Sequence, residues 1–135
     1  MKQISIFIQN KRGRLTEITK VLSENNINIC GTCLADTTEY GILRMVVDKP
    51  ELAAKVIVEC GYTVNLSEIL AVEISDAPGE LYKILDLLDH EEIGIEYLYS
   101  YVSAITQNAL IYFKTNDPKK AFEILSNANY KLLTQ

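Results

Sequence analysis

Histidine and cysteine are scarce in this sequence, which holds one histidine and three cysteines among 135 residues. A zinc site needs several Cys, His or carboxylate ligands at close spacing, and acid–base catalysis by histidine needs a group that orients the ring. His90 stands instead between Asp89 and Glu91, at the expected exposed end of a helix. An odd number of cysteines without a framework spacing fits reduced thiols. No nucleophile, base and orienting group converge, so we predict no metal site, no cofactor and no enzyme activity.

Long apolar runs are also missing. None approaches the roughly 18 residues that a membrane-spanning helix needs. The N-terminal segment, residues 1–10, alternates and turns polar too soon for a signal peptide. We therefore expect a cytoplasmic protein that makes no contact with a membrane.

Positive charge is in deficit, and the deficit lies in the second half of the chain. The residues through Leu66 hold eight Lys and Arg against seven Asp and Glu, whereas the rest hold five against eleven. A pI of about 4.9 leaves no broad basic face for a phosphate backbone, which argues against a nucleic-acid partner. The cluster of Lys11, Arg12 and Arg14 is the exception. We interpret it as a solvated basic turn or as a contact for an acidic ligand or partner.

What the sequence does contain is an internal repeat. A shift of 66 positions places Gly13 on Gly79, and from the middle of each copy a shift of 68 places Pro50 on Pro118. The shift changes between 36–41 and 102–109, where a hairpin turn would absorb two residues. Further matches are Leu15 with Leu81, Ile18 with Ile84, Leu22 with Leu88, Ile27 with Ile93, Ile29 with Ile95, Ala53 with Ala121, Val56 with Ile124, and Tyr62 with Tyr130.

Each copy predicts the element order βαββαβ. Alternating apolar residues indicate half-buried strands, and a 3.6-residue period from Leu15 and from Leu81 indicates helices. Second helices begin near Pro50 and Pro118, and Gly61 and Asn129 are expected to end them in the left-handed conformation. The expected turns include 37–41 and 106–108. The expected strands are 4–8, 27–36, 42–48 and 62–66 in the first copy, and 70–74, 93–103, 109–115 and 130–134 in the second.

This order predicts an α+β protein with two ferredoxin-like βαββαβ units in tandem, each an antiparallel sheet with helices on one face. The expected domains are 1–66 and 67–135. A unit of about 66 residues has only a marginal core of its own. We therefore expect the uncovered sheet faces and strand edges to be buried against the other copy or a second chain.

A short motif lies between the first strand and the first helix of each copy. The second copy has Asp76, Ala77, Pro78, Gly79, Glu80 and Leu81, and the first has Asn10, Lys11, Arg12, Gly13, Arg14 and Leu15. The amide or acid, the glycine and the leucine are kept, while the proline is missing from the first copy. The segment 26–29 before the second strand has a weaker echo at 92–95. With this repeat and element order, the chain resembles a tandem pair of ACT domains over its full length.

The resemblance implies a regulatory module without catalytic activity. ACT domains bind free amino acids or similar metabolites, usually at interfaces between paired units, and here a homodimer and a regulated partner enzyme or regulator are expected. In this family the ligand commonly lies between the loop of one unit and the second strand of its neighbour. The loops above would then bind the ligand, with possible walls at Asn28, Ile29, Cys30, Gly94, Ile95 and Glu96.

The chemistry of these loops suits the binding of an amino acid, although a simpler interpretation stays open. A helix N-terminus with unpaired N–H groups suits a carboxylate, and Asn10 or Asp76 would accept a hydrogen bond from an α-ammonium group. Yet Asp-x-Pro-Gly and Asn-x-x-Gly are also ordinary turn and N-cap sequences. The alternative is therefore a structural or protein-interaction module on the same scaffold that binds no small molecule.

The most reactive-looking segment, Cys30-Gly31-Thr32-Cys33, is expected to lie within a second strand. Residues i and i+3 of a strand point to opposite faces, which argues against a redox pair. We expect buried, inert cysteines. In the second copy, Tyr97, Tyr99 and Tyr101 alternate along the matching strand, and we expect them on the same face as Ile93 and Ile95, as core or interface residues.

Overall fold

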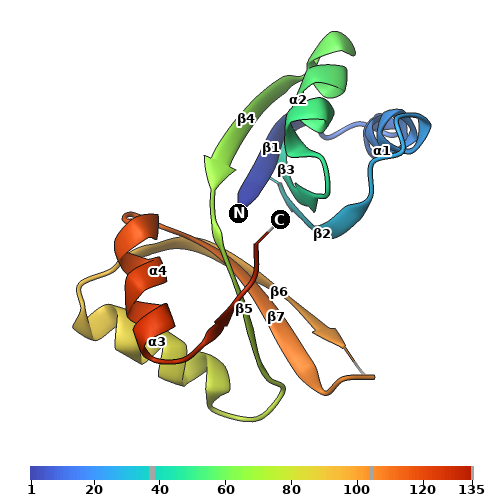
Figure 1. Cartoon of the computed structure of the whole chain (residues 1–135). Helices are drawn as coiled ribbons and strands as arrows, with labels where there is room; N and C mark the ends of the chain where they lie inside the picture. The colour runs from blue at the N-terminus through green and yellow to red at the C-terminus, as the bar shows by residue number, and fades with distance from the viewer. Residues whose placement is uncertain (37–38, 104, 135) are drawn as a thin grey trace. The chain divides into compact units, whose positions relative to one another are not determined.

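The chain folds into two compact units, Lys2–Ser67 and Glu68–Gln135 with Met1 (Figure 1). The structure is a computed structural model, and it describes residues 1–36, 39–103 and 105–134. Each unit contains one four-stranded sheet and two helices.

The first unit has the strand order β2-β3-β1-β4. The paired strands β1 and β3 are antiparallel, as are β2 and β3. Its elements are β1 (Lys2–Gln9), α1 (Arg14–Glu24), β2 (Ile29–Asp36), β3 (Tyr40–Val47), α2 (Pro50–Glu59) and β4 (Thr63–Glu68).

The second unit repeats this topology with the order β6-β7-β5-β8. Its strand β5 pairs antiparallel with β7 and with β8, and β6 pairs antiparallel with β7. The two units are ferredoxin-like, so the predicted fold class is confirmed. The elements of the second unit are β5 (Leu70–Ser75), α3 (Glu80–His90), β6 (Ile95–Ser103), β7 (Asn108–Thr115), α4 (Pro118–Asn127) and β8 (Lys131–Leu132).

Each unit builds its core between one face of the sheet and its helix pair. In the first unit, alternate residues of β1 pack against the apolar stripe of α1, which includes Ile18 and Leu22. In the second, β5 packs in the same way against Ile84 and Leu88. The α1 and α2 helices contact one another, as do α3 and α4, and each pair covers the same side of its sheet (Figure 1). These are the faces that the alternation and the 3.6-residue period predicted.

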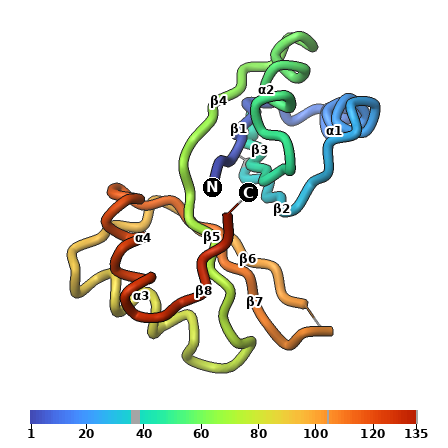
Figure 2. The backbone as a smooth tube through the Cα atoms, in the orientation of Figure 1, coloured from blue at the N-terminus to red at the C-terminus, as the bar shows by residue number. Residues whose placement is uncertain are grey.

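The ends of the second helices follow the prediction. Gly61 has φ 92° and Asn129 has φ 63°, both in the left-handed region that stops a helix. The last strand of the second unit is shorter than the predicted 130–134, since β8 covers two residues beside β5 (Figure 2). The backbone N–H of Leu133 still donates to the carbonyl of Ala71 at 2.8 Å. Within the predicted turn 37–41, Thr37 and Thr38 lie outside the described residues.

A bulge near the start of the second strand corrects the predicted face of the tyrosines. Along β6 the pairing passes from Ile95 opposite Thr115 to Tyr97 opposite Lys114, so Glu96 is one residue too many. Ile95 therefore packs on the helix side, whereas Tyr97, Tyr99 and Tyr101 lie on the other face of the sheet. The Tyr99 ring stacks there on the Tyr112 ring, with centroids 5.2 Å apart. The expectation that the tyrosines share a face with Ile93 and Ile95 is wrong, because the bulge inverts the alternation.

The same bulge occurs in β2 and involves the first cysteine. Ile29 lies opposite Val47 and Gly31 opposite Val46, so Cys30 is the extra residue. Cys30 and Cys33 are in a strand, as predicted, and both are free thiols. Cys30 is exposed, however, and Cys33 is half-buried. The prediction that both are buried is wrong for Cys30, because a bulged residue has no fixed place on the packed face, and it is not met in full by Cys33.

Candidate functional site

The two predicted loops have the same backbone conformation although their sequences differ. Gly13 precedes α1 with φ 91° and ψ −11°, and Gly79 precedes α3 with φ 89° and ψ −10°. Residues with a Cβ atom adopt this left-handed region at a cost, which explains why glycine occupies both positions. The repeat therefore conserves a backbone geometry.

Both loops leave a helix N-terminus open. Among the residues that the structure describes, no side chain caps α1 or α3, and a Cβ atom on Gly13 or Gly79 would meet nothing within 4 Å. The first N–H groups of a helix have no partner within the helix, and together they carry a partial positive charge. Each loop can therefore receive a small anionic group against its backbone.

The proline of the second loop does not determine this geometry. Glu80 N donates to the carbonyl of Ala77 at 3.3 Å, and Arg14 N donates to the carbonyl of Lys11 at 3.4 Å in the loop that lacks proline. Backbone bonds also attach the loops to the hairpins of their own units, from Asn10 N to Glu39 O and from Asp76 N to Gln107 O, both at 2.9 Å. The missing proline thus leaves the first loop unchanged in shape.

The charges of the two loops are opposite. The first helical residue is Arg14 in α1 and Glu80 in α3. Arg14 Nη1 lies 3.7 Å from Glu17 Oε2, and the hydroxyl of Tyr62 donates to the same oxygen at 3.0 Å. Burial, followed by this hydrogen bond, raises the pKa of Tyr62 above its ordinary value of 10.0. The first loop is therefore basic, whereas Asp76 and Glu80 make the second acidic.

The predicted strand residues lie at the opposite ends of the same helices. Since α1 has 11 residues, it separates its loop from the start of β2 by about 16 Å. Asn28, Ile29 and Cys30 therefore cannot join Gly13 around one small ligand within a unit. The same holds for Gly94, Ile95 and Glu96 relative to the second loop. Each unit thus brings its predicted residues together in two separate groups.

Exposed hydrogen bonds from the backbone fix the start of each second strand in the same way. Asn28 N donates to Asp48 Oδ1 at 2.9 Å, and Gly94 N donates to Asn116 Oδ1 at 3.0 Å. Asp48 and Asn116 lie two residues before Pro50 and Pro118, which mark the predicted starts of the second helices. Their role in holding the strand start follows from their position in the fold.

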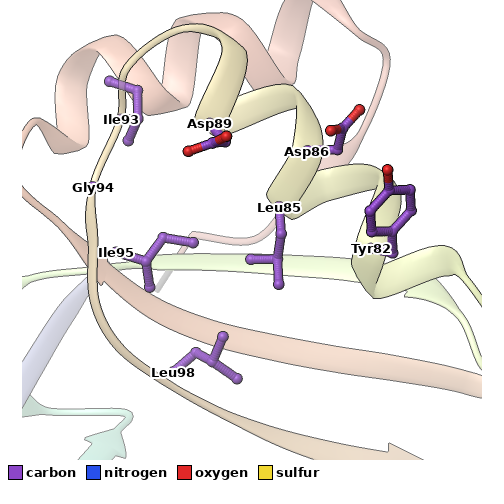
Figure 3. Close-up of a pocket in the computed structure, with 8 residues that line it drawn as sticks. All are labelled: Tyr82, Leu85, Asp86, Asp89, Ile93, Gly94, Ile95 and Leu98. Carbon is purple, nitrogen blue, oxygen red and sulfur yellow. The ribbon is translucent and has the colours of Figure 1, made fainter.

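A groove lies beside each second strand. In the second unit it has a volume of about 470 Å³, and Leu85, Ile95 and Leu98 point into it from α3 and β6 (Figure 3). Asp86 and Asp89 lie along the helical side. The matching groove of the first unit, about 350 Å³, is lined mainly by polar uncharged residues and by Leu22, Ile27 and Ile29. The polar residues are Thr19, Ser23, Asn26 and Asn28.

The residues that line this groove were not predicted from the sequence. Neither Asp86 nor the apolar positions Tyr82, Leu85 and Leu98 were candidate site residues. The spacing of Tyr82, Asp86 and Asp89 does place them on one helical stripe. The position of Leu98, however, depends on the bulge, which the alternation of β6 did not reveal.

The lone histidine is an exposed helix-end residue. His90 Nδ1 lies 2.8 Å from the backbone carbonyl of Asp86 and 3.5 Å from Asp86 Oδ1. The hydrogen bond to this carbonyl, followed by the Asp86 carboxylate, raises the pKa of His90 above its ordinary value of 6.5. The described part of the chain holds no group of three His, Cys, Asp or Glu side chains arranged for a metal ion. Within the same residues, no helix combines the length and the apolar character that crossing a membrane requires.

Comparison with known proteins identifies the family. The sequence profile described as an ACT domain pair matches residues 1–135, so this chain belongs to the ACT domain pair family. The predicted resemblance is confirmed. Among solved structures, protein BT0572 from Bacteroides thetaiotaomicron has a TM-score of 0.92 at 36% identity, over 98% of this chain and 90% of that one.

Two further solved structures share the fold at low identity. The ligand-free regulatory subunit of aspartate kinase from Thermus thermophilus has a TM-score of 0.71 at 15% identity, over 94% of this chain and 91% of that one. Aspartokinase III from E. coli, in complex with lysine and aspartate, has a TM-score of 0.56 at 16% identity, over 93% of this chain and 30% of that one. These two likenesses show the fold alone. No curated protein sequence matches this chain.

Proposed function

We propose that this protein is a non-catalytic regulatory module that binds a free amino acid or a similar small metabolite between paired ACT units. The duplicated loop carries the proposal. Both copies keep a left-handed glycine in front of an uncapped helix, with open space above it. A turn retained only for folding would not need that space in both copies.

In this proposal, each end of the ligand has its own partner in the loop. Its carboxylate would accept hydrogen bonds from the N–H groups that open α1 or α3. Its ammonium group would lie against the side chain of Asn10 in the first loop or Asp76 in the second. Because each helix separates the loop from its own second strand, the wall at 28–30 or 94–96 would come from a neighbouring unit. The domain boundaries 1–66 and 67–135 stay a prediction.

Regulation would follow from a ligand that bridges two units. Such a ligand stabilises the arrangement of units that binds it better, and a partner enzyme or regulator in contact with the module would respond to that arrangement. The name of the Thermus thermophilus structure, a regulatory subunit, supports this role through the fold. The amino acids named with aspartokinase III support the ligand class in the same way. We place the protein in the cytoplasm as a homodimer.

Thermal unfolding in the presence of each free amino acid tests the proposal. A ligand that binds only the folded chain adds roughly 2.7 kcal/mol at a hundredfold excess over its Kd. We expect one amino acid, or a small group of them, to raise the midpoint by several degrees, with heat of binding in calorimetry. If no amino acid gives either signal, the binding claim fails and the ligand-free interaction module is the better description.

Valine substitutions locate the site. Gly79→Val should remove the thermal shift contributed by the second loop, and Gly13→Val that of the first. Gly61→Val is the matched control for Gly79→Val, because Gly61 has the same positive φ and the same open space but lies in the other unit. Asn129, with φ 63°, offers the corresponding control for Gly13 in the second unit. A shift lost equally in a loop variant and its control would exclude that loop as the site.

A further inference from the structure

The first unit contains another cavity, apart from the groove beside β2. This cavity, which we call the β4 pocket, has a volume of about 300 Å³. It lies where the end of β1, the first turn of α1 and the start of β4 meet, and its lining includes Phe7, Arg14, Glu17, Cys60 and Tyr62. The strand order β2-β3-β1-β4 puts β2 and β4 on opposite edges of the sheet. The β4 pocket is therefore separate from the predicted wall at 28–30.

Contacts between distant parts of the chain hold the polar side of this pocket. Gly61 follows α2 with φ 92° and turns the chain toward β4. Tyr62 then meets α1, where its hydroxyl donates to Glu17 Oε2 at 3.0 Å. Side chains from the two ends of the unit thus hold one another in place before any ligand binds.

The β4 pocket presents a positive and a negative group side by side. Arg14 Nη1 lies 3.7 Å from Glu17 Oε2, which is too long for a hydrogen bond. A guanidinium has several N–H donors and a carboxylate has several lone pairs, so both groups can still bind a ligand. The two charges are adjacent and cancel. An α-amino acid, whose carboxylate and ammonium groups share one carbon atom, complements them better than a simple anion or cation does.

An aromatic ring gives the β4 pocket an apolar side. Phe7 is 50% exposed. A single exposed apolar residue is ordinary on a protein surface, but this one lines the same cavity as the two charges. Ligand pockets usually have volumes of roughly 300–1,000 Å³. The β4 pocket is at the lower end of this range, which suits a molecule of the size of one amino acid.

We propose that the β4 pocket binds a free α-amino acid with an apolar side chain, within the first unit alone. The ligand carboxylate lies against Arg14, its ammonium group against Glu17 and its side chain against Phe7. This site extends the proposed function, since the ligand class is the same. It needs no neighbouring unit, however, and none of the residues of β2.

The second unit does not repeat the chemistry of this pocket. Charged residues take the places of the three side chains that would hold the ligand, with Glu73 for Phe7, Glu80 for Arg14 and Lys83 for Glu17. Glu73 pairs with Lys131 at 2.6 Å, and Glu80 pairs with Lys83 at 2.7 Å. These charges lie within hydrogen-bond distance of one another, and the aromatic wall is replaced by a carboxylate. We therefore expect the site in the first unit only.

Alkylation of the full chain by N-ethylmaleimide tests the pocket. Cys60 is exposed and lines it, whereas the exposed Cys30 lies on the wall predicted for the site between units. L-valine, L-leucine, L-isoleucine, L-methionine and L-phenylalanine are added one at a time, and mass spectrometry follows each thiol. We expect at least one of them to slow the reaction of Cys60 about tenfold at about ten times its Kd, since only the empty pocket reacts. The amide of that amino acid, which lacks the carboxylate, should protect far less.

Two variants with matched controls locate the protection. Glu17→Gln should abolish it, and Glu24→Gln should not, although Glu24 lies in the same helix and pairs with Lys20 at the same distance of 3.7 Å. Phe7→Ala should weaken it, whereas Phe122→Ala, at a ring that is 43% exposed on α4, should leave it unchanged. Protection that survives Glu17→Gln, or a Cys60 that none of these amino acids protects, would overturn the proposal.

The two thiols also separate this site from the site between units. Protection of Cys60 alone would support the β4 pocket and count against a ligand at the wall 28–30. Protection of Cys30 alone would refute the β4 pocket and leave the site between units in place. If both thiols react at unchanged rates, and calorimetry shows no heat of binding, both sites are refuted.

Discussion

The first helices of the two units, α1 and α3, occupy equivalent places in the fold but carry opposite charges. In the first turn, Arg14 pairs with Glu17 in α1, whereas Glu80 pairs with Lys83 in α3. The backbone in front of both helices is nevertheless the same. The repeat has therefore kept the conformation that the loop requires and changed the side chains that a ligand or partner would meet.

The inversion continues at the other end of these helices. Lys20 lies 3.7 Å from Glu24 in α1, and at the same positions Asp86 lies 3.5 Å from His90 in α3. In α3 the first residue is the acid Glu80 and the last is the base His90, which agrees with the helix dipole, whereas α1 begins with Arg14 and ends with Glu24. The two copies are therefore one scaffold with two different surfaces.

The largest expected effect tests whether the two loops have the same backbone conformation. Gly13→Ala and Gly79→Ala should each lower the free energy of unfolding by about 1–2 kcal/mol, because a Cβ atom disfavours the positive φ. No clash adds to this loss, since nothing lies within 4 Å of either new atom. Urea unfolding measures both. Unequal losses would show that the two loops differ in solution.

Gly94→Ala is the control for these glycines. Its Cβ atom would meet Asn116 at 3.7 Å, an ordinary contact, and Gly94 does not have a positive φ. We expect a change within about 0.5 kcal/mol. A large loss here would mean that the effect at Gly13 and Gly79 is not specific to the left-handed conformation.

A smaller change in stability is expected at the starts of the second helices, α2 and α4, which differ in their caps. Asp117 Oδ1 accepts a hydrogen bond from Lys120 N at 3.0 Å and caps α4, whereas Lys49 at the same position leaves α2 without a side-chain cap. Asp117→Ala should lower the free energy of unfolding by about 1 kcal/mol. Lys49→Asp should raise it by less, because the bond from Lys49 Nζ to Asn26 O is lost. Chemical denaturation of both variants measures these changes in the free energy of unfolding. A stability unchanged by Asp117→Ala would contradict the assigned cap.

The smallest effect concerns pH and only the second unit. The pKa of His90 should lie above 6.5, and Asp86→Asn should lower it, which proton NMR follows through the single imidazole of the chain. Because the folded state raises this pKa, the stabilisation is complete below the unfolded value and disappears as pH rises through the folded value. The residue of α1 that corresponds to His90 is Glu24, so the stability of the first unit should not change in this way near neutral pH. A His90 pKa at or below 6.5 would contradict the contact.

Much of the fold was predictable because its signals are local. Apolar residues at alternate positions or at a 3.6-residue period marked the faces of β1, β5, α1 and α3. Glycine or asparagine marked the ends of the second helices, at Gly61 and Asn129. The repeat then gave each assignment a second, independent observation. Exact limits were less certain, as the short β8 shows.

The candidate site was predictable only in part. The loops at Gly13 and Gly79 were identified from their residues, and the structure adds their common conformation. The grooves were not predicted. Their walls come from a helix and a strand, and sequence periodicity does not give the distance between the two. Asp86 and Asp89 belong to a groove only because Leu98 of β6 lines the same groove.

The sequence by itself determined two ferredoxin-like units, their helix faces and the glycine positions, since these depend on residues close together in the chain. Only the tertiary structure decided which side chains of β2 and β6 face the helices. One extra residue, Cys30 or Glu96, reverses the alternation of the strand. That reversal depends on pairing with residues of β3 or β7 that lie 15 or more positions further along the chain at the bulge, such as Val46 for Gly31 and Lys114 for Tyr97. Pairing across such a distance leaves no mark in local periodicity.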